Sequence, residues 1–212
     1  MTQTVINPIT LERFKKGKTW QEYLESGIRN RELFEDNYKG LEITADQKRR
    51  LKALAAKPNG PHHVVVIGED WCPDVYRGTG IAQKMAEAMD IEFRFFERDQ
   101  NKDMIQPYLK NGEFESIPVF VFFDSQHREI AHFIERPALA NEQLHQTREV
   151  LGDTSPEGIA KQLGHDPSEE ELAAARAAAR EKYMAWQKGP VWAGWRVATV
   201  DEVAGMLEKA TA

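Results

Sequence analysis

Apolar residues along the chain fall into short continuous runs, rich in β-branched and aromatic side chains, and longer stretches in which they recur every three or four positions. The short runs predict buried strands, and the longer stretches predict amphipathic helices. The runs interpreted as strands are HHVVVIG (62–68), IEFRFFE (91–97), SIPVFVFFD (116–124) and REIAHFIE (128–135). The polar turn between the last two is short, which predicts an antiparallel hairpin.

Helical patterns separate and follow these strands. Residues 74–90 place Ile81, Met85 and Met89 at helical spacing. Residues 101–112 predict a shorter helix, which Pro107 must kink or end early. Another helix is expected over 136–152. The resulting order is strand, helix, strand, helix, strand, strand, helix, which predicts an α/β fold.

Helical segments also flank this central region. Capping-box patterns at Thr19 with Glu22 and at Thr44 with Gln47 predict helices before the break PNGP at 58–61. In the tail, Ser155 followed by Pro156 marks a helix start. Two further tail helices are expected over 168–187 and 199–210, the second with Thr199 and Glu202 as its capping box. The predicted domains are a helical N-terminal extension (1–60), a core (61–152) and a helical C-terminal extension packed on the core (153–212).

Charge and cysteine content narrow the function classes. Lys and Arg total 28 against 34 for Asp and Glu, a formal net charge of −6, which disfavours a nucleic-acid partner. No run approaches the roughly 20 apolar residues of a membrane helix, and residues 1–16 lack the pattern of a signal peptide. Cys72 is the single cysteine and cannot form an internal disulfide. We therefore expect a reducing, cytoplasmic setting.

Cys72 lies in EDWCPDV (69–75), between a predicted strand and a predicted helix. The free N–H groups and the positive dipole end of a helix favour a thiolate there. Pro73 suits the first helical position, where no N–H is needed. Asp74, Glu69 and Asp70 carry negative charges that oppose a thiolate. The sequence therefore leaves the direction of the Cys72 pKa shift open.

The segments VVVIGEDWCPDV (64–75) and SIPVF (116–120), in this order of elements, resemble the thioredoxin family. The WCPD stretch is similar to a branch in which aspartate precedes the second cysteine and helical extensions flank the core. The resemblance implies a three-layer α/β/α sandwich with a mixed four-stranded sheet. It also implies that Cys72 is catalytic, that Pro118 is a cis-proline, and that Ile117 offers its backbone to a substrate. Trp71, Pro73 and Asp74 complete the implied substrate-binding set.

Two departures from the family pattern concern the chemistry. Val75 occupies the position of the second, resolving cysteine, and Val66 occupies that of a buried aspartate that assists proton transfer. The resemblance therefore implies monothiol thiol–disulfide exchange with a protein or small-molecule partner. Glutathione would be the co-substrate of that route, and no cofactor is firmly implied. The alternative is a redox-inactive binding or scaffold module.

Other interpretations of Cys72 stay open at this point. It could be a small buried hydrophobe. An iron–sulfur carrier completed by glutathione is a third possibility, although the surrounding glutaredoxin pattern is absent. A cysteine hydrolase would need a nearby histidine that the sequence does not place.

Three further features of the sequence resemble possible sites. His62 and His63 are consecutive on a strand and so point to opposite faces, which disfavours a shared metal. RGTG (77–80) lacks the ending of a phosphate loop and is better explained by close helix packing. Trp186, Trp192 and Trp195 could line a cleft, but such a cluster more often anchors an extension.

Overall fold

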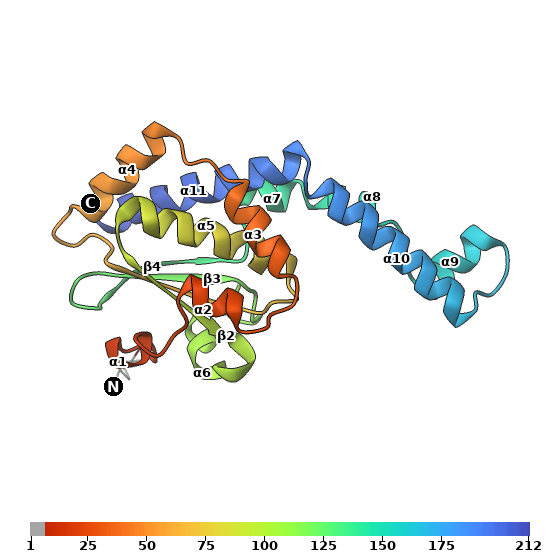
Figure 1. Ribbon diagram of the computed structural model, residues 1–212, viewed down its shortest axis with the longest axis horizontal. Helices are drawn as coiled ribbons and strands as arrows, with labels where there is room; N and C mark the ends of the chain where they lie inside the picture. The colour runs from red at the N-terminus through yellow and green to blue at the C-terminus, as the bar shows by residue number, and fades with distance from the viewer. Residues whose placement is uncertain (1–6) are drawn as a thin grey trace. The chain divides into compact units, whose positions relative to one another are not determined.

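The computed structural model describes residues 7–212, which contain a single mixed β-sheet (Figure 1). Its strand order is β2-β1-β3-β4. β1 (His63–Gly68) pairs in parallel with β2 (Glu92–Glu97) and antiparallel with β3 (Val119–Phe123), which pairs antiparallel with β4 (Glu129–Ile134). The predicted α/β fold with a mixed four-stranded sheet is confirmed. The first six residues of the predicted N-terminal extension lie outside the described residues.

The central strands are apolar because both of their faces are covered. Residues 64–67 of β1 and all of β3 are fully buried. The outer strands β2 and β4 mix buried and exposed positions, as their sequence pattern predicts. The two central strands therefore hold the middle of the core.

The helix that follows β1 has 17 residues. α5 (Pro73–Met89) runs along one side of the sheet, and α6 (Lys102–Ile105) lies on the other side (Figure 1). The predicted helix over 101–112 is shorter than expected. It becomes a 3-10 turn, η2 (Gln106–Tyr108), around Pro107, since proline cannot donate a helical hydrogen bond. A further turn, η1 (Arg98–Gln100), precedes α6.

From residue 7 onward, four helices precede the sheet: α1 (Leu11–Phe14), α2 (Trp20–Glu25), α3 (Arg31–Lys39) and α4 (Ala45–Ala55). The capping boxes predicted at Thr19 and Thr44 are both confirmed. The backbones of Lys18 and Phe95 exchange hydrogen bonds of 3.0 and 2.7 Å, which attaches this segment to β2. Tyr23 stacks on Phe95 with ring centroids 3.7 Å apart.

The helices after the sheet differ in part from the sequence prediction. The helix expected over 136–152 is two helices, α7 (Ala138–Glu142) and α8 (Leu144–Leu151). α9 (Pro156–Leu163) starts at the predicted Ser155 cap, and α10 (Glu169–Trp186) follows. α11 (Pro190–Ala210) starts well before Thr199, so the predicted Thr199 capping box is wrong. Pro190 follows the end of α10 and is the first residue of α11, a position that suits proline.

The described chain forms two compact units. Unit 1 comprises the residues up to Arg136 together with Arg196–Ala212, and unit 2 is Pro137–Trp195. The predicted division at 60 and 152 stays a prediction. No helix within residues 7–212 is long and apolar enough to cross a membrane.

Aromatic packing holds part of unit 2 together. Trp186 lies 5.8 Å from Trp192 and 5.4 Å from Trp195 between ring centroids, and Tyr183 stacks on Trp186 at 5.8 Å. The Trp195 Nε1–H donates to Gln143 Oε1 at 2.8 Å. These contacts join α7, α8 and the end of α10 to the start of α11.

Candidate functional site

Cys72 lies where β1 gives way to α5. It is the N-cap residue of that helix, with extended backbone angles (φ −85°, ψ 125°) and Pro73 at the start of the helix. The Val75 and Tyr76 N–H groups donate to the Cys72 carbonyl at 3.0 and 3.1 Å. The thiol is free and half-buried. The sulfur therefore sits at the positive end of a 17-residue helix.

The loop that enters β3 faces this sulfur. The Ile117–Pro118 peptide bond is cis, and both residues are buried. The Cys72 thiol points to the Ile117 carbonyl oxygen, with an S–O distance of 3.8 Å. Gly78 lets α5 approach the loop, because a Cβ there would lie 2.8 Å from Pro118 Cγ. The RGTG segment thus permits close helix packing.

Val75 lies in the first turn of α5, and its side chain is fully buried. That it replaces a resolving cysteine stays a prediction from the family resemblance. A Cβ on Gly68 would lie 2.6 Å from Val75 Cγ1, so the valine packs directly on the end of β1. This position thus carries a buried apolar side chain and no thiol.

Two aromatic side chains near the site are exposed. Trp71 is 50% exposed and Phe114, in the loop before Ile117, is 54% exposed. Arg98 contacts Trp71 and the residue after Phe114. Its guanidinium lies 5.6 Å from the Trp71 ring centroid, and its Nη1 donates to the Glu115 carbonyl at 3.4 Å. The half-buried thiol therefore has accessible apolar surface on the residue before it.

The acidic residues before Cys72 point to other partners. Glu69 Oε1 accepts from the Asp99 N–H at 2.7 Å, and Asp70 Oδ2 accepts from the Arg29 N–H at 2.7 Å. Burial raises the pKa of Glu69, although the Asp99 N–H opposes that shift. Both carboxylates therefore serve to hold the loop rather than to contact the thiol.

Asp74, the acid after Cys72, is held by two arginines. Asp74 Oδ1 lies 2.7 Å from Arg77 Nη1, and its Oδ2 lies 2.8 Å from Arg136 Nη2. Arg136 also pairs with Glu135, which pairs in turn with Lys110. A chain of alternating charges thus runs from α5 to the residues after β4.

The protonation of Cys72 follows from these surroundings. Burial raises the pKa of the thiol above that of a free cysteine, and the negative charge of Asp74 raises it further. The Val75 and Asp74 N–H groups and the Arg136 charge lower it, but by less. The thiol form is therefore favoured at neutral pH, which settles the direction that the sequence left open.

Comparison with protein-family models identifies the fold family. The model described as thioredoxin matches residues 17–149, more than half of the chain. The chain belongs to the thioredoxin family. No curated protein matches this chain.

Two solved structures share the thioredoxin-family fold of this chain. One is a 1.5 Å crystal structure of a protein of unknown function, PA1234, from Pseudomonas aeruginosa. It is 15% identical, with a TM-score of 0.60 over 95% of this chain and 99% of that one. The other is an HIV epitope-scaffold, 16% identical, with a TM-score of 0.56 over 93% of this chain and 96% of that one. At these identities the likeness concerns the fold alone.

Within this thioredoxin-family protein, the residues predicted for the site lie together. Cys72, Trp71, Pro73 and Asp74 are consecutive at the start of α5, and Ile117 and Pro118 face the sulfur. Their roles in catalysis and substrate binding stay predictions. Among residues 7–212, no group of three His, Cys, Asp or Glu side chains is arranged to hold a metal ion.

The sequence interpretation missed the cations around this site. Arg77 could have been found, since it follows Asp74 by three positions on a predicted helix, where opposite charges pair. Arg136 gives no such local signal, because its partner lies on a distant segment. The sequence also carries no sign of the neighbour of His63. Its ring lies beside that of His127, and the Nδ1 atoms of His63 and His127 are 3.4 Å apart.

Proposed function

We propose that this protein carries out thiol–disulfide exchange through Cys72 alone, with glutathione or a similar small thiol completing the cycle. The observation that carries the proposal is the Cys72 thiol, half-buried at the start of α5 and 3.8 Å from the Ile117 carbonyl. A helix N-terminus supports the thiolate that attacks a disulfide. Trp71, half exposed beside it, offers apolar surface to a substrate.

The proposed cycle balances with two thiol exchanges. The Cys72 thiolate attacks one sulfur of a disulfide, forming a mixed disulfide and releasing the other sulfur as a thiolate that takes up a proton. A glutathione thiolate then attacks the substrate sulfur of the mixed disulfide. Cys72 leaves as a thiolate, and the substrate departs joined to glutathione. An external thiol is required because Val75 has none.

The partners of this route are proteins or small molecules that carry a thiol or a disulfide. A reducing compartment supplies the external thiol, and we place the activity in the cytoplasm because the chain has a single cysteine. The proposal includes neither a nucleic acid nor a membrane as a partner.

A second function, a redox-inactive binding module, is favoured by one observation. Burial raises the pKa of Cys72, so little thiolate forms at neutral pH. In that case the surface around Trp71 and Phe114 would bind a partner without turnover.

One experiment separates these two functions. The native protein is incubated with oxidised glutathione, and the adduct is measured by intact mass before and after excess thiol. Monothiol exchange predicts an adduct that excess thiol removes, and no adduct on Cys72→Ser. It also predicts failure in an insulin-reduction assay coupled to thioredoxin reductase. A wild-type thiol that reacts only after unfolding would contradict exchange and support the binding module.

A further inference from the structure

The carboxylate of Asp74 is enclosed by positive charge although it lies two residues from the thiol. Its two oxygens contact different arginines, Arg77 at 2.7 Å and Arg136 at 2.8 Å. The side chains of these three residues are 13%, 1% and 15% exposed, respectively. Burial weakens screening by solvent, so these charges influence their neighbours more strongly than surface pairs do.

Arg136 is placed by the same loop that faces the sulfur. The Glu135 N–H donates to the Pro118 carbonyl at 2.7 Å, which ties the end of β4 to the cis-proline loop. The Glu135 carboxylate contacts both Arg136 and Lys110. Arg136 therefore reaches Asp74 from a segment that also fixes the position of Ile117 and Pro118.

The elements around the thiol differ in the charged groups that they contribute. α5 contributes Asp74 and Arg77, and the segment after β4 contributes Glu135 and Arg136. The cis-proline loop contributes only the uncharged Ile117 and Pro118 at the sulfur. Glu69 and Asp70, in the loop before α5, are bound to backbone N–H groups elsewhere.

The balance of these charges decides how readily the thiolate forms. The negative charge of Asp74 raises the pKa of Cys72, whereas Arg136 lowers it. Arg136 pairs with Asp74, so its positive charge offsets the negative charge of the carboxylate. The ion pair also fixes where that carboxylate lies. Arg77, on the opposite side of that carboxylate, holds its other oxygen.

We propose that Arg136 is a positioning residue of the Cys72 site: its guanidinium holds the Asp74 carboxylate, two residues from Cys72, and supplies the counter-charge of that carboxylate. The proposal rests on the thiol–disulfide exchange proposed above. The residues that follow Cys72 in the sequence supply an acid, Asp74, and the counter-charge comes from Arg136 on the segment after β4.

The test measures how the alkylation rate of Cys72 depends on pH in the full chain, together with the ultraviolet absorbance of the thiolate. Arg136→Met removes the charge, and we expect alkylation near neutral pH to slow by about tenfold, the effect of one pKa unit. Arg136→Lys restores the charge and should recover most of the rate. Asp74→Asn removes the opposing anion and should shift the profile the other way. Arg49→Met, which removes an exposed arginine on α4, is the matched control and should keep the wild-type profile.

The outcomes separate this inference from the proposed function. If Cys72 reacts normally but Arg136→Met keeps the wild-type pH profile, the positioning role is overturned and thiol exchange still stands. If the wild-type thiol reacts only after unfolding, the proposed function fails and this inference fails with it. If Arg136→Met does not fold by circular dichroism, Asp74→Asn decides, because an unchanged profile in that variant contradicts the role.

Discussion

The side chain of Val75 packs directly on Gly68, at a distance that leaves no room for another carbon: a Cβ on Gly68 would lie 2.6 Å from Val75 Cγ1. Gly68 is the last residue of β1, and Val75 lies in the first turn of α5. The strand therefore approaches the helix closely at Val75. The family resemblance predicts that a dithiol protein has its second cysteine at this position.

We expect Val75→Cys to form a disulfide with Cys72 on mild oxidation, because its sulfur would lie one turn into the helix that Cys72 caps. The measurement is the number of free thiols in denaturant, which should fall from two to none and return after reduction. Val75→Ala is the control for lost packing. It should keep one free thiol and lower the free energy of unfolding by about 1–3 kcal/mol. Two free thiols in oxidised Val75→Cys would show that the positions cannot be bridged.

The glycine at the contact between α5 and the cis-proline loop should be hard to replace. In Gly78→Ala, the new Cβ would lie 2.8 Å from Pro118 Cγ and 3.1 Å from Phe120 Cζ. We expect a loss of about 1–3 kcal/mol in the free energy of unfolding, as in other overpacked cores. Gly205→Ala on α11 is the matched control, since its nearest neighbour is 3.5 Å away. The control should gain up to about 1 kcal/mol from helix propensity, and equal effects in the two variants would contradict the packing argument.

The features that the sequence predicted well depend on neighbours in the chain. The caps at Thr19, Thr44 and Ser155 each involve hydrogen bonds within three residues, so the local pattern is sufficient. The central strands are equally clear, since burial on both faces requires continuous apolar runs.

The features that the sequence missed depend on the fold or on competing local signals. The contact of Arg136 with Asp74 depends on the pairing of β4 with β3, and the local sequence around either residue does not predict it. The predicted start of the last helix was wrong, because the segment Lys188, Gly189 and Pro190 is as typical of the end of a helix as of the start of one. The direction of the Cys72 pKa shift needed the burial of the sulfur, which composition and spacing do not give.

The last helix should contribute strongly to the stability of unit 1. Leu207 on α11 is fully buried, and near it the Arg50 guanidinium pairs with Glu208 at 2.5 Å. We expect Leu207→Ala to lower the free energy of unfolding by about 2–5 kcal/mol, because it leaves a cavity in a packed core. Val197→Ala, at a position on the same helix that is 42% exposed, should change it by less than about 1 kcal/mol. Denaturant unfolding of both variants checks this, and a small loss in Leu207→Ala would show that α11 is only loosely attached.

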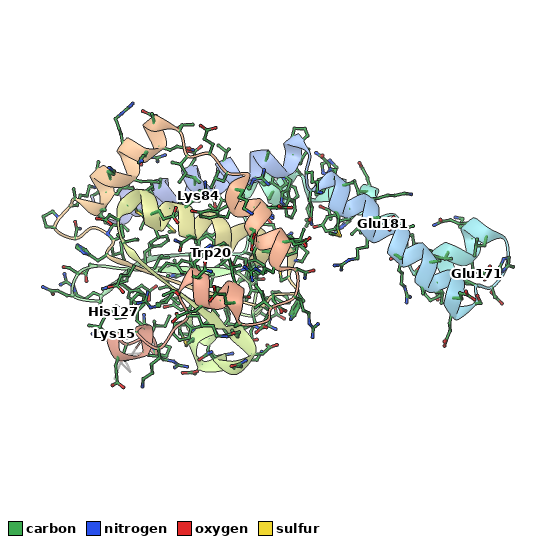
Figure 2. The ribbon with its side chains drawn as sticks, in the orientation of Figure 1. Lys15, Trp20, Lys84, His127, Glu171 and Glu181 are labelled. Atoms are coloured by element: carbon green, nitrogen blue, oxygen red, sulfur yellow. The ribbon has the colours of Figure 1, made fainter. Side chains whose placement is uncertain are left out.

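A pair of histidines should make stability depend on pH. The His63 and His127 rings lie side by side, and His127 Nε2 is 3.0 Å from the Ile9 carbonyl oxygen. His127 lies near α1 (Figure 2). His127 also stacks on Phe123, with ring centroids 4.3 Å apart. Burial lowers the pKa of both histidines, and the charge of His127 lowers that of His63 further.

These depressed pKa values make the folded state bind fewer protons than the unfolded state just below the ordinary histidine value of about 6.5. The free energy of unfolding should therefore be fully retained above that pH and fall as the pH decreases through it. We expect His63→Phe to flatten this dependence by up to about 1.4 kcal/mol per pH unit, while its ring keeps the packing against Phe14. The measurement is denaturant unfolding at a series of pH values from 7.5 down to about 5. His145→Gln, which replaces an exposed histidine on α8, is the control and should retain the wild-type slope. An unchanged slope in His63→Phe would show that other groups govern the acid sensitivity of the fold.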